Sequence, residues 1–327
     1  MKLFRLKEKK TPEELKTIIF PESEEIRVLN AVDFILKKKI ARVILIQKKN
    51  RPEIKIKPNT NLIIIDEDFS VQFLENYHKI RLKKNPAYKI SQSKSDIRNS
   101  ITFACLLLKE NFADGIIAGS VYSTSEVLRN AISIVGLEKN NKTVSSFFLL
   151  HFSGKSEFRK KVLAFADCGV IPVPDYKQLS DIALQTAGNF LKLTGITPRV
   201  AFLSFSTKGS AADSSLEKII KAYNLTRKRN PDLICDGELQ FDTAFVPEVS
   251  KRKNPDGTIK GNANVFIFPD LNSGNIAYKI AERLGGASAT GPVVQGLSRP
   301  VMDLSRGCSS NDIINMTLVV NGMISKV

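Results

Sequence analysis

The sequence predicts an α/β fold built around parallel β-sheets. Short apolar runs rich in β-branched residues recur along the chain, and longer segments with the spacing of amphipathic helices lie between them. Strands that are apolar along their whole length suit sheets that helices cover on both faces. The length of 327 residues and the 43% hydrophobic content suggest two domains, and they exclude a disordered or disulfide-scaffold chain.

In the first 140 residues, strands are expected where apolar β-branched residues run together, and helices where apolar residues recur three or four positions apart. In chain order the sequence predicts a strand at 17–20, a helix at 24–37, strands at 42–46 and 62–65, a helix at 99–109, a strand at 115–118 and a helix at 123–134. The polar segment 138–143 has no periodicity, so it is a candidate crossing between two domains.

The same alternation continues beyond the crossing. In chain order we expect a strand at 144–150, a helix at 176–194, a strand at 200–205, a helix at 214–224, strands at 233–235 and 265–268, and a helix at 276–284. Residues 250–262 are predicted to form a loop, because Pro255, Asp256 and Gly257 make a turn signal there.

The net charge is +16, and residues 1–100 contain 23 basic and 13 acidic side chains. The lysine runs 37–39, 48–49 and 83–84 lack the interleaved aromatic residues of a single-strand binding surface. A solvated lysine-rich surface is therefore the preferred interpretation, and no nucleic-acid partner is expected. A basic nucleic-acid-binding protein stays open as an alternative function.

The cysteines and the apolar runs indicate a cytoplasmic protein with no membrane partner. Cys105, Cys168, Cys235 and Cys308 lie far apart, which favours neither a zinc site nor a disulfide framework. The basic N-terminal segment 1–10 is not followed by the apolar stretch of a signal peptide. The longest apolar runs fall well short of the roughly 20 residues that a membrane span needs.

Two loops rich in glycine, serine and threonine are candidate anion sites. The first, 203–215, places Lys208 and several hydroxyl groups at a probable helix start, where backbone N–H groups attract anions. It matches neither the P-loop pattern nor the dinucleotide pattern, and an ordinary strand–helix turn explains it equally well.

The second loop, 291–312, is predicted to bind phosphate, with Arg306 as the residue that holds the anion. Arg306 follows Ser305 there, and a guanidinium matches phosphate oxygens in a bidentate manner. Asp312 ends the segment, and by itself it would more often be a helix N-cap. His78 and His151 have no metal-ligand spacing, and nothing in the sequence favours a Ser-His-Asp triad.

Several segments resemble phosphate acetyltransferases of the phosphate acetyl/butyryl transferase family. They are 18–27, 113–124 with Arg129, 203–211, 236–244, 264–284 and, most specifically, 291–312. The chain departs from the family pattern at Ser23, Ser298, Arg299 and Met302, and residues 47–100 resemble the family only weakly.

The resemblance implies two three-layer α/β domains of the isocitrate/isopropylmalate-dehydrogenase-like type, with the active site in the interdomain cleft. The first domain would comprise residues 1–140 plus 292–327, and the second, residues 141–291, would be inserted into it. The resemblance further implies a homodimer in acetate metabolism that acts on coenzyme A (CoA), acetyl-CoA, acetyl phosphate and inorganic phosphate. No permanently bound cofactor and no metal are implied.

The resemblance also assigns roles to individual residues. Asp312 would be the base for the CoA thiol, which is only a few per cent thiolate at pH 7 without help. Ser305, Arg306 and Arg283 would stabilise the oxyanion and the departing phosphate. The remaining residues expected to bind substrate are Arg129, Arg81, Ser206, Thr207, Lys208 and Gly209.

Two further alternatives stay open. A phosphate butyryltransferase would share this pattern and would differ in the pocket around the acyl group. A decarboxylating dehydrogenase of related fold would need a cluster of aspartate metal ligands and a nicotinamide site, and neither is visible in the sequence.

Overall fold

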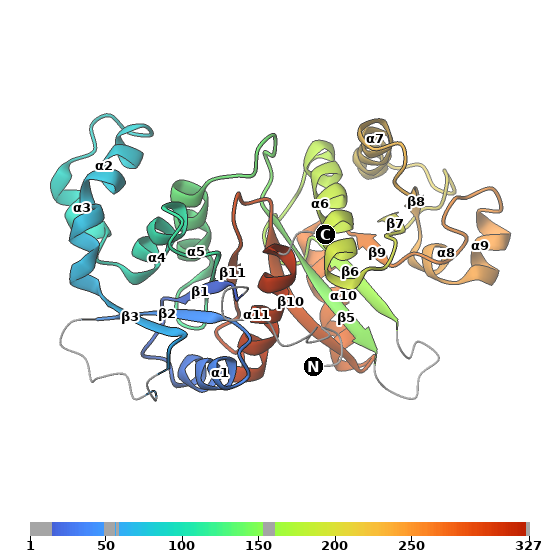
Figure 1. Ribbon diagram of the computed structural model, residues 1–327. Helices are drawn as coiled ribbons and strands as arrows, with labels where there is room; N and C mark the ends of the chain where they lie inside the picture. The colour runs from blue at the N-terminus through green and yellow to red at the C-terminus, as the bar shows by residue number, and fades with distance from the viewer. Residues whose placement is uncertain (1–14, 49–55, 57–58, 153–160, 325–327) are drawn as a thin grey trace. The chain divides into compact units, whose positions relative to one another are not determined.

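The computed structural model describes residues 15–48, 56, 59–152 and 161–324. The chain divides into two compact units (Figure 1): unit 1 holds the chain up to Lys139 and from Leu297 to Lys326, and unit 2 holds Asn140–Gly296. The basic segment 1–10 and Lys49 of the lysine run 48–49 lie outside the described residues. No helix in the described part of the chain is long and apolar enough to cross a membrane.

Unit 1 contains a five-stranded parallel sheet with the order β11-β4-β1-β2-β3. Helices α1 and α11 pack together on one face of this sheet, and α4 and α5 lie on the other (Figure 1). The strands are β1 (Thr17–Phe20), β2 (Arg42–Gln47), β3 (Leu62–Asp66), β4 (Gly115–Ala118) and β11 (Val301–Asp303). The helices are α1 (Ile26–Lys37), η2 (Glu67–Phe73), α2 (Leu74–Leu82), α3 (Ile90–Asp96), α4 (Ser100–Lys109), α5 (Thr124–Asn130), η3 (Ala131–Val135) and α11 (Ser310–Ile324).

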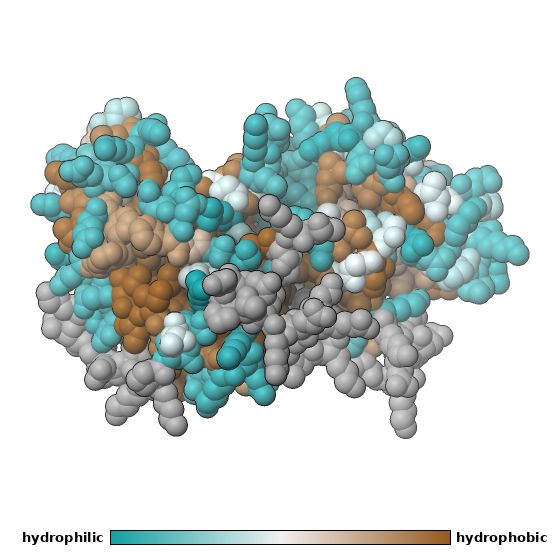
Figure 2. Space-filling view, in the orientation of Figure 1, coloured by the Kyte–Doolittle hydropathy of each residue, from teal (hydrophilic) through white to brown (hydrophobic). Residues whose placement is uncertain are grey.

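Strand β3 corrects the expectation that the apolar strands are buried on both faces. It lies at the edge of the sheet, and Ile63 and Ile64 are 50% and 42% exposed. Figure 2 shows an apolar area over the β2 and β3 side of this unit. Apolar composition predicted a strand here, but it did not distinguish an edge position from a central one.

Unit 2 contains a six-stranded mixed sheet with the order β10-β5-β6-β9-β7-β8. Strands β10, β5 and β6 pair in antiparallel fashion and the others in parallel, so the expectation of parallel sheets was wrong at this edge. The strands are β5 (Ser145–Phe152), β6 (Val162–Ala166), β7 (Val200–Leu203), β8 (Cys235–Leu239), β9 (Val265–Ile267) and β10 (Ala287–Gln295). The helices are α6 (Tyr176–Thr194), α7 (Ser214–Arg229), α8 (Phe241–Phe245), α9 (Pro247–Lys253) and α10 (Leu271–Arg283).

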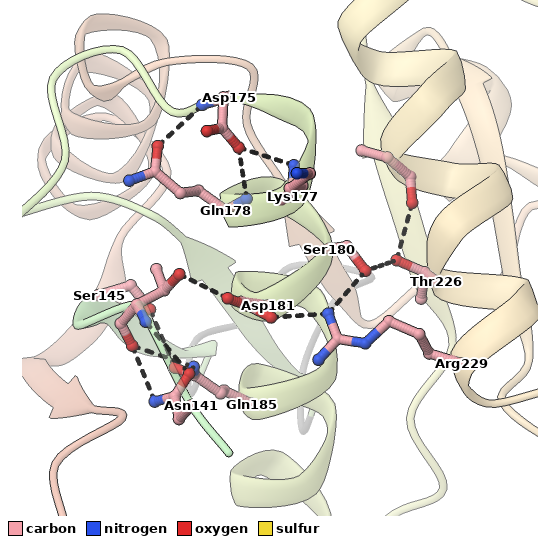
Figure 3. Close-up of polar contacts among 12 residues, drawn as sticks. Asn141, Ser145, Asp175, Lys177, Gln178, Ser180, Asp181, Gln185, Thr226 and Arg229 are labelled. Carbon is pink, nitrogen blue, oxygen red and sulfur yellow. Dashed lines mark hydrogen bonds and ion pairs between the residues drawn. The ribbon is translucent and has the colours of Figure 1, made fainter. Parts of the chain in front are cut away.

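Helix α6 anchors the segments at which the chain enters and leaves unit 2 (Figure 3). Asp175 caps the helix by accepting hydrogen bonds from the N–H groups of Lys177 and Gln178. Asp181 accepts from Thr143 Oγ1 at 2.5 Å, and Arg229 of α7 pairs with the same carboxylate at 2.6 Å. In addition, Asn141 Nδ2 donates to Gly296 O and Gln185 Nε2 donates to Asn141 Oδ1. This network fixes both ends of the unit 2 segment to one helix.

Several predicted boundaries in unit 2 were wrong. The helix expected at 276–284 is α10, which begins at Leu271, and the helix expected at 214–224 is α7, which continues to Arg229. The strand expected at 233–235 is β8, and it contains Asp236 and Glu238, which are buried. The loop expected at 250–262 begins inside α9, which continues to Lys253 and ends where the backbone N–H of Asn254 donates to Ser250 O. The sequence did not predict the part of β8 beyond Cys235, because a charged residue normally predicts an exposed position and Asp236 and Glu238 are buried.

Candidate active site

The segment after β11 holds Ser305 and Arg306, and both side chains are exposed. A short turn shapes this segment: Ser305 Oγ accepts from Gly307 N at 3.2 Å, and Ser305 O accepts from Cys308 N at 2.9 Å. The Arg306 guanidinium forms no hydrogen bond or ion pair with any other described residue. It is therefore available to an anionic ligand.

Asp312 lies in the first turn of α11 and closes a capping box. Ser309 N and Ser309 Oγ each donate to Asp312 Oδ2 at 2.8 Å, and Asp312 N donates back to Ser309 Oγ at 3.3 Å. This corrects the alternative in which Asp312 itself is the N-cap, because Ser309 occupies that position. Asp312 is exposed, and no described residue donates to its Oδ1, so that oxygen can accept a proton from a ligand.

The guanidinium of Arg27 holds this segment by binding its backbone carbonyl groups. Its Nη1 donates to Arg306 O at 2.7 Å and to Cys308 O at 2.8 Å, while Nη2 donates to Ser120 O at 3.1 Å. The Arg27 Nε pairs with Glu25 at 2.8 Å. The guanidinium thereby connects the loop after β11 to the loop after β4.

Glu22 performs a similar task one strand away. It follows β1, is 7% exposed, and accepts hydrogen bonds from the backbone N–H groups of 119–122 and from the Ser120 hydroxyl. These N–H groups form an anion-binding nest, and the side chain of Glu22 already fills it. This loop consequently offers its N–H groups to the protein rather than to a substrate phosphate.

Two buried groups near this segment have perturbed acidity. Burial raises the pKa of Asp303, at the end of β11, to about 6, and the charge of Glu22 adds to the rise, while a hydrogen bond from Thr124 opposes it. Burial also raises the pKa of the Cys308 thiol. Cys308 is therefore not a ready thiolate nucleophile.

Arg129 and Arg81 lie on helices of the same unit. Arg129 is exposed in the last turn of α5. Arg81, at the end of α2, lies over the ring of Tyr88 at 4.5 Å, and the Tyr88 hydroxyl donates to Asp96 of α3. Arg81 Nε is buried and has no hydrogen-bond partner among the described residues.

In unit 2 the donors of the 206–209 loop are engaged by protein groups. Ser206 Oγ and Gly209 N donate to the buried carboxylate of Glu238 at 3.1 and 2.7 Å. Lys208 Nζ pairs with the buried Asp236 at 2.5 Å, and Thr207 Oγ1 accepts from Gln240 N. As in the loop that Glu22 fills, an internal carboxylate occupies the position of an anion.

Arg283 closes α10 and is exposed over 81% of its side chain. Its Nε lies 3.6 Å from Glu282 Oε2, which is long for an ion pair. The structure thus groups Ser305, Arg306 and Asp312 around the start of α11, whereas Arg283 and the 206–209 loop belong to the other unit.

The sequence interpretation gave no role to Glu22, Arg27 or Asp303. Glu22 follows β1, Asp303 ends β11, and Arg27 lies in the first turn of α1, the helix after β1. All three therefore stand near the carboxyl ends of parallel strands, where polar residues usually form a site. That position is the signal that identifies them.

The chain is similar to known proteins over nearly its whole length. Residues 3–320 match the family model described as phosphate acetyl/butaryl transferase. A phosphate acetyltransferase of Acetivibrio thermocellus is 42% identical over 94% of this chain and 93% of its own. Phosphotransacetylase structures from Streptococcus pyogenes and Staphylococcus aureus have TM-scores of 0.87 and 0.84. Each is 33% identical to this chain and covers 95% of it, and the matched part is 94% and 95% of their own chains.

The family predicted from the sequence is confirmed by these matches, which extend over nearly the whole chain. The chain belongs to the phosphate acetyl/butaryl transferase family, and it is an acyltransferase.

Proposed function

We propose that the protein transfers an acetyl group reversibly between acetyl-CoA and inorganic phosphate, giving acetyl phosphate and CoA. The observation that carries this proposal is the group of side chains at the start of α11. Asp312 has a carboxylate oxygen without a partner among the described residues, and Ser305 and Arg306 expose a hydroxyl and a guanidinium in the preceding turn. A base, a hydroxyl donor and a cation are the groups that acyl transfer to phosphate requires.

In the direction of thiolysis, Asp312 accepts the proton of the CoA thiol. The thiolate forms a bond to the acetyl carbonyl carbon of acetyl phosphate, and an electron pair moves to the carbonyl oxygen. When the tetrahedral adduct collapses, the pair on that oxygen re-forms the C=O bond. The bond between the carbon and the phosphate oxygen breaks, and phosphate leaves with the electron pair of the broken bond, giving acetyl-CoA. Arg306 and Ser305 stabilise the negative charge on the adduct and on the departing phosphate.

Other residues are proposed to bind substrate. Arg129 and Arg81 would bind the phosphate groups of CoA or acetyl phosphate, and Arg283 would stabilise the departing phosphate. The 206–209 loop would contribute Lys208 and its neighbours once substrate displaces the carboxylates of Asp236 and Glu238 from their donors. The same resemblance leads us to propose domains of the isocitrate-dehydrogenase-like type, with boundaries at 1–140 plus 292–327 and at 141–291. It also leads us to propose a cytoplasmic homodimer, which light scattering at several protein concentrations tests.

The decisive experiment is thiolysis of acetyl phosphate by CoA, followed as thioester absorbance. We expect fast turnover that falls by about 10²–10⁴-fold in Asp312→Asn, because a positioned base contributes that much. Butyryl phosphate is measured in parallel. A preference for butyryl phosphate would retain the mechanism and change the substrate, whereas full activity of both Asp312→Asn and Arg306→Ala would refute the proposed roles.

A further inference from the structure

Asp303 is a buried carboxyl group to which the proposed mechanism gives no task. It ends β11, two residues before Ser305, and is only 4% exposed. The hydroxyl of Thr124, the first residue of α5, lies beside this carboxyl group and lowers its pKa, against the effect of burial. Its Oδ1 has no hydrogen-bond partner in the described part of the chain. Burying a carboxyl oxygen without a hydrogen-bond partner lowers the stability of the folded state, so such a group calls for an explanation.

The surroundings of Asp303 are the junction of two loops. Gly119 lies directly against it, with φ +98°, and a Cβ at that position would be 2.5 Å from Asp303 Oδ1 and 2.5 Å from Leu304 N. Leu304 N donates to Ala118 O at 2.7 Å, so the chain leaves β11 in close contact with the end of β4. Only glycine fits between the two segments, and any shift of the Asp303 side chain would be felt by both.

We propose that Asp303 is a positioning residue, whose buried side chain constrains the segment carrying Ser305 and Arg306 by packing at the end of β11 against Gly119 and beside the start of α5. This inference rests on the proposed roles of Ser305 and Arg306. Asp303 touches no reacting atom in this account. It determines the direction in which the chain leaves the strand, and thereby where the hydroxyl and the guanidinium lie.

Asp303 and Arg27 constrain the segment that carries Ser305 and Arg306 at different points. Arg27 holds the carbonyl groups of Arg306 and Cys308 from outside, whereas Asp303 fixes the origin of the same segment from within the sheet. Glu22 is the charged group that acts on Asp303 from the β1 side, and Thr124 is the polar neighbour on the α5 side. Without the Asp303 side chain, the backbone would be less constrained where it leaves β11. No group that touches substrate would be removed.

The test uses Asp303→Ala, Asp303→Asn, Thr124→Val and the double variant Asp303→Ala/Thr124→Val. We expect Asp303→Ala to lower kcat by about 10- to 100-fold, because small misplacements of catalytic groups cost that much. The KM for CoA should change by less than about 2-fold, because no binding group is lost. Asp303→Asn keeps an acceptor for Thr124 and should restore kcat to within about 3-fold of the wild type.

The cycle with Thr124 distinguishes positioning from general destabilisation. Thr124→Val should lower kcat alone but add nothing to Asp303→Ala, since both changes remove one link. Asp33→Ala, on the exposed side of α1, is the matched control and should leave kcat unchanged. Thr124 is exposed, so its variant tests the link even if Asp303→Ala does not fold.

Wild-type kcat in Asp303→Ala, or additive losses in the double variant, would overturn the inference. If Arg306→Ala is inactive while Asp303→Ala is normal, the inference fails and the proposed function stands. If Arg306→Ala and Asp312→Asn keep full activity, the proposed function fails and the inference fails with it.

Discussion

The guanidinium of Arg27 binds the backbone of Arg306, with Nη1 2.7 Å from the carbonyl oxygen. The two residues are 279 positions apart, and one arginine thus fixes the backbone of another whose side chain stays exposed and available to a ligand. A flexible exposed arginine loses conformational freedom when it binds an anion, and a fixed backbone reduces that loss.

We therefore expect Arg27→Met to lower kcat by about 10-fold or more, because the segment holding Ser305 and Arg306 loses two backbone contacts and its link to Ser120. Arg27→Lys should recover little, since one ammonium cannot reproduce the fork that reaches Arg306 O, Cys308 O and Ser120 O. Steady-state kinetics of acetyl phosphate thiolysis checks this. Arg98→Met, an exposed arginine of the same unit, is the control, and an equal loss in that variant would contradict the explanation.

The free energy of unfolding should depend on pH, because folding raises the pKa of Asp303. Its pKa is raised from 3.8 to about 6, so the native state binds a proton that the unfolded state releases between these values. The free energy of unfolding therefore falls as pH rises through this window, by at most about 3 kcal/mol. Asp303→Asn cannot ionise, so its stability relative to the wild type should improve between pH 4 and pH 7.

Urea unfolding of the wild type and Asp303→Asn at pH 4, 5, 6 and 7 measures this difference. Glu22→Gln supplies a second comparison, because the negative charge of Glu22 contributes to the raised pKa of Asp303. A constant difference in stability between wild type and Asp303→Asn across the four pH values would contradict the assignment.

The pattern of the sequence predicted the regular elements well where local signals agreed. Helix α6 was expected at 176–194 and occupies Tyr176–Thr194, because Asp175 caps its start and Gly195, with φ +71°, ends it. Strands β6, β10 and β11 were not predicted. Strand β10 contains Gly291 and Pro292 and reads as a loop, and its conformation depends on antiparallel pairing with β5.

The candidate site was predictable only in part. Ser305, Arg306 and Asp312 stand within one continuous segment that resembles a family, so a linear motif was enough to single them out. Arg27 and Ser120, which hold this segment, could not be predicted from a linear motif. Parallel pairing of β1, β4 and β11 brings them to the segment. Such contacts follow from strand order, which local sequence does not specify.

The capping box at the start of α11 separates a structural contribution from a chemical one. Ser309→Ala removes the N-cap hydroxyl, and we expect it to cost about 1 kcal/mol of stability while Asp312 remains as a base. Asp312→Asn keeps an oxygen that can accept from Ser309 but loses the base. Thermal unfolding together with kcat measures both effects, and a larger kcat loss in Ser309→Ala than in Asp312→Asn would contradict these roles.

Buried carboxylates in unit 2 make Lys208 more important for stability than an exposed lysine. Lys208 pairs with Asp236, whose side chain is only 3% exposed, and Gly237 O accepts a second hydrogen bond from it. Removing the lysine leaves a buried carboxylate without its counter-charge, which is more costly than losing an exposed pair. Because Lys208 itself is 35% exposed, water partly replaces it, and we expect Lys208→Met to cost about 1–3 kcal/mol.

The matched control is Lys221→Met, which breaks the exposed i,i+4 pair with Glu217 on α7 and should change stability by less than about 0.5 kcal/mol. Urea unfolding at pH 7 compares the two variants. Since Asp236 is the source of the difference, Asp236→Asn should reduce the effect of Lys208→Met in a double-mutant cycle. Equal losses for both lysines, or additive effects in the cycle, would show that the 206–209 loop is not held by this ion pair.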